Sequence, residues 1–581
     1  MGGRAARDED VVYEPPPSMR PPWAAAVALA LVLALLLSSN GRPIGAGDTR
    51  PTERVAASLV QEHDFDLDEY PEVEPPFARE VAGHRVSVYP VLSAVMAAPV
   101  FAAAGAAFAL DETGSALAGK VAASLFSALA GAVFFLVLAR RHPLAQARWT
   151  ALVFALGTTI WSTSQALWQH PAAVLFICVA LLFAAWAEED AAWAGRAGLP
   201  LALAVAARHA DVALAAALAA AIGLRWRRQA PWLALWASPA VAFVLLYDWR
   251  TFGSPLQHGF SDSLSRFSEP WGVGHVGLLA SPAKGLFVFT PMAAVALAGF
   301  VRAWRLGERW WPAALAAAAL AHWVLIGRWS EWHGGESWGP RLMTDALPLL
   351  LFFLPEAQDT LPLLTRVAAA LSIAVQALGA FAYDYSWERI HQRVGASGHA
   401  ELWDVAGSPI VYYARRRALY LDAPGVKDGR ALIHEHPLVP FGRTGSQVTF
   451  AGDAPTVSGT DRTLGDVFLQ RGARVEGARA KLKGRWDGIF LRVRPEARAR
   501  TLELRVQGRG HGTLYVGEKT FWTEPRWTVY PMAGAFGIRH PYRYAESGGA
   551  DVTVTLGRSP GEAEIDSLSL VPSAPAPPRP R

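Results

Sequence analysis

Residues 118–139 read AGKVAASLFSALAGAVFFLVLA, an apolar stretch whose one charged residue is Lys120. About 18–20 consecutive apolar residues form a helix long enough to cross the hydrocarbon core of a bilayer. The chain as a whole is 52% hydrophobic and 18% charged, which is more apolar than an average soluble protein. Further runs of the same kind lie at 22–38, 90–110, 149–163, 170–187, 198–223, 232–248, 286–302, 309–327, 341–355 and 361–383. The sequence therefore predicts a mainly α polytopic membrane protein with about 10–12 transmembrane helices.

Charge and cysteine content exclude several other classes of protein. The net charge is +4 over 581 residues, and no block of lysine and arginine suggests nucleic acid as a partner. Cys178 is the single cysteine and lies in an apolar run, so the chain has neither a disulfide framework nor a cysteine metal cluster. Residues 1–20 are rich in proline and mixed charge, which predicts a disordered tail. No cleavage motif follows run 22–38, so we expect a retained anchor helix.

The pattern changes near the C-terminus, where apolar and charged residues alternate in short stretches such as KLKGRWDGIFLRVRP (481–495) and ADVTVTLGR (550–558). This period of two is typical of half-buried antiparallel strands, and predicts an all-β, jelly-roll-like domain. The segment SPIVYYARRRALYL (408–421) is suited to an interfacial helix. The predicted domains are a disordered tail 1–20, a transmembrane domain 21–385, a connector 386–446, a β-sandwich 447–573 and a disordered tail 574–581.

Arginines in short loops predict the orientation, because cytoplasmic loops carry an excess of positive charge. Such residues follow two of the runs, at 225–228 and at 302–309. If both loops are cytoplasmic, the N-terminus is also cytoplasmic. Segments 40–89, 249–285 and 328–340 and the β-domain then lie outside the cytoplasm.

The arginines at 140, 141 and 148 leave two arrangements open. Their loop is cytoplasmic only if run 90–110 does not span fully and run 198–223 turns back at ARHAD (207–211). In the alternative both runs span, and these arginines lie outside. The first arrangement is favoured, because an Arg-His-Asp set at mid-membrane is costly.

Two long loops on the predicted outer side are unusually rich in aromatic and charged residues. They read YDWRTFGSPLQHGFSDSLSRFSEPWGVGHVGLLASPAKGLFVFTP (247–291) and GRWSEWHGGESWGPR (327–341). Loops of this length are usually functional or disordered, and aromatic content argues against disorder. Tryptophan can stack on sugar rings or form an interfacial belt, and the interleaved charges favour a pocket. The candidate residues for an acceptor or sugar pocket are His258, Glu331, Trp332, His333, Glu336 and Trp338.

The order of these segments resembles a known group of enzymes. GDT (47–49) and DFDLDEY (64–70) are followed by HRVSVYPVLSAVMAAPVF (84–101), and then by YDWRTFGSPLQHGF, SPAKGLFVFTP and WHGGESWGPRLMTDALPLL. Over residues 22–385 the chain resembles bacterial integral-membrane glycosyltransferases of the GT-C superfold, in the group that includes protein mannosyltransferase-like and aminoarabinose transferase-like proteins. The C-terminal domain resembles a carbohydrate-binding jelly roll.

The resemblance implies that the chain transfers a sugar from a polyprenyl-phosphate carrier to a glycan, lipid or protein acceptor, in the inner membrane of a bacterium and on its outer side. It matches Asp48 to the family's acidic residue after the first helix, which accepts the acceptor's proton. On sequence alone, Asp48 is equally suited to cap the helix PTERVAASLVQE (51–62). The candidates to hold the anionic phosphate are Arg341, Lys284 and Arg250.

Other polar clusters are given structural interpretations. DFDLDE fails as a nucleotide-sugar motif, because no βαβ pattern exists, and as a calcium loop, because Glu69 and Pro75 stand where glycine and glutamate are needed. A solvated loop or short strand is expected there. Arg208 and Asp211, with His209, are expected to neutralise one another at a helix turn. No cofactor is required, although the histidines and glutamates of the outer loops are compatible with a divalent metal.

Two further functions compete with the transferase. A transporter or flippase for lipid-linked glycans should place polar residues or broken helices near the middle of the bilayer. The polar residues here concentrate in outer loops, which favours the enzyme. A non-catalytic glycan-binding assembly protein would use the β-domain instead.

Overall fold

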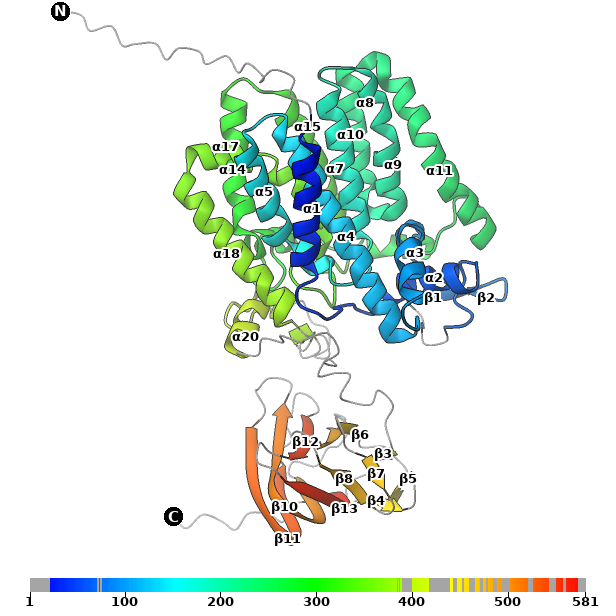
Figure 1. Cartoon of the computed structure of the whole chain (residues 1–581), viewed down its shortest axis with the longest axis vertical. Coiled ribbons are helices and arrows are strands. Elements are labelled where there is room, and N and C mark those ends of the chain that lie inside the picture. Colours follow the sequence, from blue (N-terminus) through cyan, green and yellow to red (C-terminus); the bar gives the residue numbers. More distant parts are fainter. Residues whose placement is uncertain are drawn as a thin grey trace, which may run out of the picture. The chain divides into compact units, whose positions relative to one another are not determined.

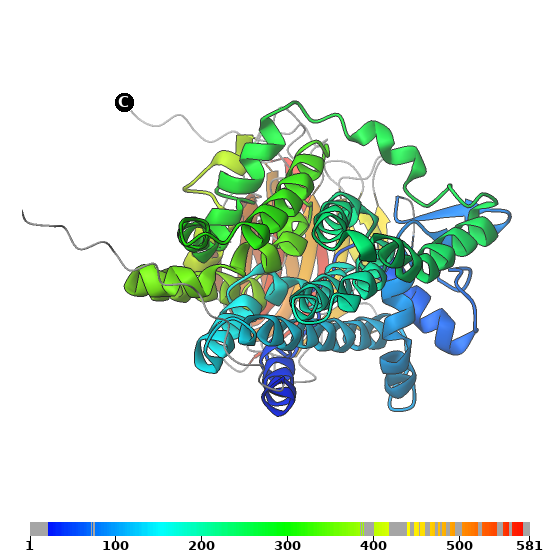
Figure 2. The same cartoon turned by 90° about the horizontal axis from the view of Figure 1, so that it is seen from above.

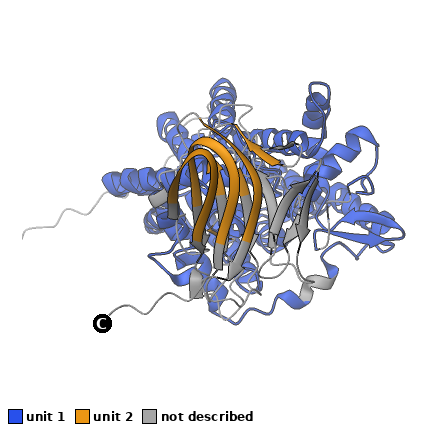
Figure 3. Ribbon diagram, turned by 90° about the horizontal axis from the view of Figure 1, so that it is seen from below, with its two compact units in different colours: residues 1–385, 399–421 blue, residues 386–398, 422–581 orange. Residues whose placement is uncertain are grey.

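The computed structural model describes residues 21–383 apart from 71, 72, 74 and 75, then 385, 387, 388 and 400–416, and beyond residue 438 the strands with residues 483 and 561. The chain forms two compact units (Figure 3). Unit 1 contains residues 1–385 and 399–421, and unit 2 contains residues 386–398 and 422–581. The two predicted disordered tails, 1–20 and 574–581, lie outside the described residues.

Unit 1 is helical, with one short hairpin of two strands (Figure 1). Its helices are α1 (Trp23–Leu37), α2 (Arg50–Gln61), α3 (Leu92–Gly105), α4 (Glu112–Ala139), α5 (Leu144–Leu156), α6 (Thr159–Thr163), α7 (His170–Trp186), α8 (Ala192–Arg196), α9 (Gly198–Ala207), α10 (Val212–Arg225), α11 (Ala230–Phe252), α12 (Val273–Ala280), α13 (Leu286–Phe289), α14 (Pro291–Arg305), α15 (Trp310–Gly327), α16 (Leu347–Leu351), α17 (Leu354–Thr360), α18 (Pro362–Phe381) and α20 (Pro409–Arg416). The strands are β1 (Ala78–Val81) and β2 (His84–Ser87).

Four helical segments of the described chain are long and apolar enough to cross a membrane: α4, residues 227–252, α15 and α18. Five shorter apolar helical segments accompany them. Each long helix packs against shorter ones: α4 against α1 and α7, α11 against α9, α15 against α10, and α18 against α14. Figure 2 looks down on these helices from above. Runs 149–163, 198–223 and 341–355 are divided into shorter helices rather than forming single spans. In the last run, Pro348 and Pro355 each stand in the first turn of a new helix, where the missing N–H costs nothing.

One end of the unit gathers the arginines of the short loops, and we call it the basic end. Arg140 pairs with Glu189, and Arg141 pairs with Glu308. Arg225 lies 4.0 Å from Glu188. These contacts bring together the loops after α4, α7, α10 and α14. These arginines therefore lie together at one end of the unit, as the favoured arrangement requires.

Run 198–223 forms a helical hairpin of α9 and α10. The chain breaks at Arg208, and the short 3-10 helix η1 (His209–Asp211) makes the turn. The segment before α9 and the segment after α10 lie together at the basic end, since a Cβ added at Gly195 would lie 2.7 Å from the Cβ of Trp232. Helix α3, in run 90–110, has only 14 residues. This is the arrangement that the sequence favoured.

The opposite end, which we call the loop end, is built from segments 40–89, 249–285 and 328–341. Backbone hydrogen bonds join them: the N–H of Glu269 donates to the carbonyl of Arg328 at 3.0 Å. The side chain of Arg79 reaches the carbonyl of Gly259 at 3.4 Å. Helix α20 belongs to the same unit, and Tyr413 on it packs against Trp338 with ring centroids 5.7 Å apart. The polar loops are thus one assembly.

Close helix packing at Gly299 gives a first testable prediction. Helices α14 and α17 meet there, and an added Cβ would lie 1.9 Å from the carbonyl oxygen of Phe353. We expect Gly299→Ala to lower the free energy of unfolding by about 1–3 kcal/mol, because the backbones must move apart. Gly223→Ala is the matched control, since its Cβ meets only the Cβ of Ala230 at 3.7 Å. Thermal unfolding in detergent gives the melting temperatures of the two variants. Equal melting temperatures for Gly299→Ala and Gly223→Ala would contradict the close approach of α14 and α17.

Unit 2 is an antiparallel sheet in which β10 (Leu502–Thr520) pairs with three strands. Its partners are β11 (Arg526–Tyr542), β12 (Ala550–Leu556) and β13 (Glu562–Pro572). The other strands are β3 (Val439–Phe441), β4 (Gln447–Ala451), β5 (Ala454–Ser458), β6 (Gly465–Gln470), β7 (Arg474–Glu476), β8 (Arg479–Leu482) and β9 (Gly488–Val493).

Alternation along the strands follows the sequence prediction. Leu504, Val506, Leu514 and Val516 of β10 are all buried. Strand β10 is continuous from Leu502 to Thr520, and its register with β13 shifts after Gln507. Figure 3 shows these long strands curving over. The predicted fold class, a helical membrane unit followed by an all-β domain, is confirmed.

Candidate functional site

Asp48 and Arg341, which are 293 residues apart in the sequence, form an ion pair at the loop end. Nη1 of Arg341 donates to Oδ2 of Asp48 at 2.6 Å, and its Nη2 donates to the carbonyl of Gly334 at 2.7 Å. The guanidinium also lies over the ring of Trp168, 4.0 Å from its centroid. The side chains are only 11% and 18% exposed, for Arg341 and Asp48. Three segments of the chain thus hold one guanidinium in place.

Asp48 does not cap the following helix. The N-cap of α2 is Thr49, and no side chain caps this helix. Burial raises the pKa of the Asp48 carboxyl, and the charge of Arg341 offsets this only in part. A carboxylate with a raised pKa is a better proton acceptor than an exposed one.

A pocket adjoins this ion pair. Arg341 and Glu336 give it charge, and Trp168, Trp338 and two tyrosines give it aromatic walls. The complete lining is Ile44, Ser162, Thr163, Trp168, Glu336, Ser337, Trp338, Arg341, Gly379, Tyr383 and Tyr385. Sequence reasoning missed Trp168, Tyr383 and Tyr385. They stand in WQH and AYDY, aromatic segments that border apolar runs, and that position was the available signal.

Lys284 supports the pocket from behind. Only 1% of this residue is exposed, and its ammonium group donates to the carbonyls of Gly335 and Ser337. The lysine therefore holds the loop that carries Glu336. Arg250 is exposed near the end of α11.

The other sequence candidates are distributed over different surroundings. Glu331 is exposed and lies 3.7 Å from Arg266, whereas Trp332 is fully buried against Gly277. Nδ1 of His333 accepts a hydrogen bond from the N–H of Gly335. Of the six predicted pocket residues, the pocket beside Asp48 contains Glu336 and Trp338.

His258 lies in a second hollow, between segment 88–91, the α9–α10 turn and α11. Its ring meets that of His209 edge-on, with centroids 5.1 Å apart. Tyr89 lines the same hollow, and burial, followed by the nearby charge of Asp48, raises the pKa of its hydroxyl.

Glu53, in the first turn of α2, is a second buried carboxylate near the ion pair. Oε1 of Glu53 accepts a hydrogen bond from the N–H of Leu167 at 3.4 Å, next to the tryptophan that lies under Arg341. Burial raises the pKa of Glu53 to about 7. Sequence reasoning missed it among the acidic residues of this loop.

The pKa of Glu53 predicts a pH dependence of stability. The folded value of about 7 exceeds the ordinary 4.5. The folded state therefore holds this proton more tightly, so the group's contribution is complete below pH 4.5 and is lost as the pH rises to 7. The change is on the order of 3 kcal/mol. Thermal unfolding across this range should show a shallower slope for Glu53→Gln, and an unchanged slope for Glu112→Gln, a half-exposed partner of Arg50.

The DFDLDE segment is an ordered part of the loop end. Asp68 accepts hydrogen bonds from the N–H of Arg85, at 2.7 Å, and from His84, at 2.8 Å, and Asp66 bridges to Val86 of β2. The hairpin β1–β2 therefore fixes the segment. This agrees with the expected loop or short strand.

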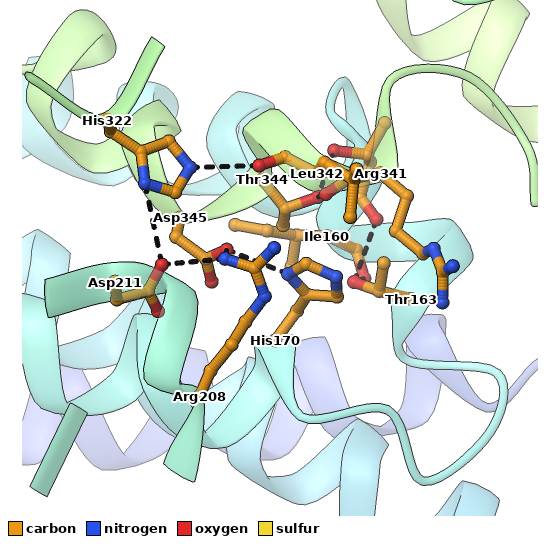
Figure 4. Close-up of polar contacts among 11 residues, drawn as sticks. Ile160, Thr163, His170, Arg208, Asp211, His322, Arg341, Leu342, Thr344 and Asp345 are labelled. Atoms are coloured by element: carbon orange, nitrogen blue, oxygen red, sulfur yellow. Dashed lines mark hydrogen bonds and ion pairs between the residues drawn. The ribbon is translucent and has the colours of Figure 1, made fainter. Parts of the chain in front are cut away.

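Behind Arg341 lies a buried cluster of charged side chains (Figure 4). Arg208 donates to Asp211 at 2.7 Å and lies 3.0 Å from Asp345. Nδ1 of His170 lies 2.8 Å from Asp345, and His322 lies 3.6 Å from Asp211. The predicted pairing of Arg208 with Asp211 is present, but the sequence did not reveal that Asp345 and two histidines complete it.

No protein-family model matches the chain, and no curated protein matches it. Among solved structures, the chain is similar to the crystal structure of ArnT from Cupriavidus metallidurans bound to undecaprenyl phosphate. The two sequences are 14% identical, the match covers 64% of this chain and 68% of that chain, and the TM-score is 0.43. Each chain therefore contains regions without a counterpart in the other.

Proposed function

We propose that the chain is a membrane glycosyltransferase that moves a sugar from a polyprenyl-phosphate donor to an acceptor hydroxyl at the loop end. The observation that carries this proposal is the buried Asp48–Arg341 pair beside an aromatic pocket. A transferase of this kind needs a proton acceptor and a cation for an anionic leaving group within one site. The pair supplies both, and the aromatic walls suit the apolar face of a sugar.

The proposed reaction is a displacement at the anomeric carbon. The acceptor oxygen attacks that carbon and forms the new glycosidic bond, while its proton passes to a carboxylate oxygen of Asp48. The bond between the sugar and the phosphate oxygen breaks, and the lipid phosphate leaves as an anion. Arg341 stabilises the negative charge of the phosphate. The contact between Arg341 and the phosphate weakens the ion pair between Arg341 and Asp48. We therefore expect this ion pair to separate as the substrates bind.

The orientation belongs to the same proposal. The arginines of the basic end favour the cytoplasm under the positive-inside rule. The loop end, with Asp48, then faces the outside of a bacterial inner membrane. Single cysteines at residues 226 and 335 test this: an impermeant reagent added to intact cells should label 335 and leave 226 unlabelled. The opposite pattern would overturn the orientation.

Transfer by the purified protein tests the activity. Full-length protein in detergent, supplied with polyprenyl-phosphate-linked sugars and envelope glycan or lipid acceptors, should release free polyprenyl phosphate in proportion to acceptor. Release that stays at the level of a heat-inactivated sample with every donor would contradict the proposal.

A transporter of lipid-linked glycans is the second candidate. The buried charges of Arg208 and Asp211 at the break between α9 and α10 are of the kind that transporters place between helices. Detergent micelles separate the two functions, because transport has no readout without two compartments. Sugar transfer in micelles supports the enzyme, and flipping in vesicles without transfer in micelles supports the transporter.

A further inference from the structure

The buried cluster behind Arg341 contains a group of potential metal ligands that the proposed reaction does not use. Asp211, His322 and Asp345 are each 0% exposed. One ligand atom from each lies within 4.8 Å of those of the other two. They come from η1, α15 and the 3-10 helix η4 (Arg341–Ala346), so three distant parts of the sequence converge there.

The hydrogen bond of His322 fixes its tautomer. Nε2 lies 2.9 Å from the carbonyl oxygen of Leu342. A carbonyl oxygen only accepts, so Nε2 carries the hydrogen. In the neutral ring, Nδ1 then presents a lone pair, and Figure 4 shows that it faces Asp211. The two facing atoms, Nδ1 of His322 and Oδ1 of Asp211, are 3.6 Å apart.

Nδ1 of His322 and Oδ1 of Asp211 face one another as two acceptors, and a proton or a metal cation between them stabilises such a pair. The 3.6 Å separation is longer than the usual range of about 2.7–3.2 Å for an N–H···O hydrogen bond. Among the described residues, Nδ1 of His322, Oδ2 of Asp211 and Oδ1 of Asp345 also lack a hydrogen-bond partner. Buried polar atoms are rarely left in this state.

The charge of the cluster points in the same direction. With neutral imidazoles, Asp211 and Asp345 carry two negative charges and Arg208 supplies one positive charge. Burying the remaining charge without a partner is costly. Arg208 lies on one oxygen of each carboxylate, at 2.7 and 3.0 Å, which leaves the second oxygen of each available.

We propose that Asp211, His322 and Asp345 bind a divalent transition-metal ion, with zinc as the reference case. Zinc takes nitrogen and carboxylate oxygen at about 2.0–2.2 Å in a tetrahedron, so two ligand atoms lie about 3.4 Å apart. The 3.6 Å between Nδ1 of His322 and Oδ1 of Asp211 is close to that edge, and Oδ1 is the oxygen that also accepts from Arg208 at 2.7 Å. The hydrogen bond from Nε2 to Leu342 is the outer contact that usually orients a metal-binding histidine.

The ion would join η1, α15 and η4 at one point. Asp345 lies on η4 with Arg341, and the hydroxyl of Thr344 donates to the carbonyl of Arg341 at 2.6 Å. A metal held by Asp345 therefore fixes the short helix that carries the guanidinium. The site is structural, and it is separate from the pocket that contains Glu336.

Metal content of the purified protein is the test. Full-length protein in detergent is incubated with zinc or manganese, desalted and analysed by mass spectrometry, and its melting temperature is followed with and without chelator. The variants are His322→Gln and Asp211→Asn. His275→Gln is the matched control, a buried histidine of α12 whose Nε2 lies 3.3 Å from the carbonyl of Val324.

We expect about one metal ion per chain in the wild type and in His275→Gln, and at least a tenfold loss in both cluster variants. Chelator should lower the melting temperature of the wild type by several degrees and leave that of Asp211→Asn unchanged. If His322→Gln does not fold, Asp211→Asn, which keeps its shape, decides the matter. The proposal is overturned if the wild type holds less than about one tenth of an equivalent of metal and its melting temperature ignores both metal and chelator.

The exposed set Asp66, Asp68 and His84 is an internal comparison. It also offers three ligand atoms within 4.8 Å, but Asp68 already accepts two hydrogen bonds there. Asp68→Asn should therefore leave the metal content unchanged. Loss of the metal in this variant would place the ion at the surface and overturn the buried site.

Discussion

Asp48→Asn is expected to lower the rate of sugar transfer by about 10²–10⁴-fold, the usual contribution of a general base. Asparagine keeps the shape of the side chain and can still accept from Nη1 of Arg341, which lies 2.6 Å from Asp48 in the wild type. The loss should therefore fall on kcat, with little change in KM. The assay measures polyprenyl phosphate released by purified protein at saturating donor and acceptor.

Asp68→Asn serves as the control, because Asp68 is an exposed acidic residue of the same outer segment. Its transfer rate should stay within about twofold of the wild type, as expected for a surface substitution. Both variants should melt close to the wild type. If Asp48→Asn retains the full rate while remaining folded, Asp48 is not the base, although the pocket and the pair would stand.

Asp345→Ala is expected to lower the free energy of unfolding by about 3–5 kcal/mol, because it removes the buried acceptor that Arg208 and His170 share inside the helical unit. Asp345 is 0% exposed, lies 3.0 Å from Arg208 and 2.8 Å from His170. The change should be visible as a large fall in melting temperature in detergent.

Asp359→Ala is the matched control for this second variant. Asp359 is exposed and accepts one hydrogen bond from Gln146 at 3.0 Å. Its removal should change the free energy of unfolding by less than about 0.5 kcal/mol. Similar losses for the two aspartates would show that the buried cluster adds no special stability.

Hydropathy predicted the fold class well, because a long apolar segment is stable only where it is buried in protein or in a membrane. Apolar runs such as 118–139 do form helices in the structure. It could not predict where a run breaks. The buried turn at Arg208 is neutralised in part by Asp345, which lies 137 positions later in the sequence. Single-segment patterns contain no information about such a partner, so run 198–223 had to be left with two arrangements.

The candidate site shows the same limit. Asp48 was selected from the family resemblance and Arg341 from its place beside an apolar run, but their contact could not be predicted across 293 residues. Lys284 was predicted as a phosphate ligand from its charge and its place near a membrane–loop boundary. Its burial against the carbonyls of Gly335 and Ser337 depends on packing of the outer loop. Glu53 was missed because nothing in its segment distinguishes a buried glutamate from an exposed one.

The hairpin of α9 and α10 has a consequence for how related chains could diverge. The chain enters and leaves this hairpin at the basic end. The hairpin therefore does not carry the chain from one side of the membrane to the other. A gain or loss of this pair would leave every later segment on its original side, whereas the gain or loss of one full span would invert all of them. The polar turn Arg208–Asp211 could therefore be acquired or lost in evolution without changing the side of the membrane on which the later segments lie.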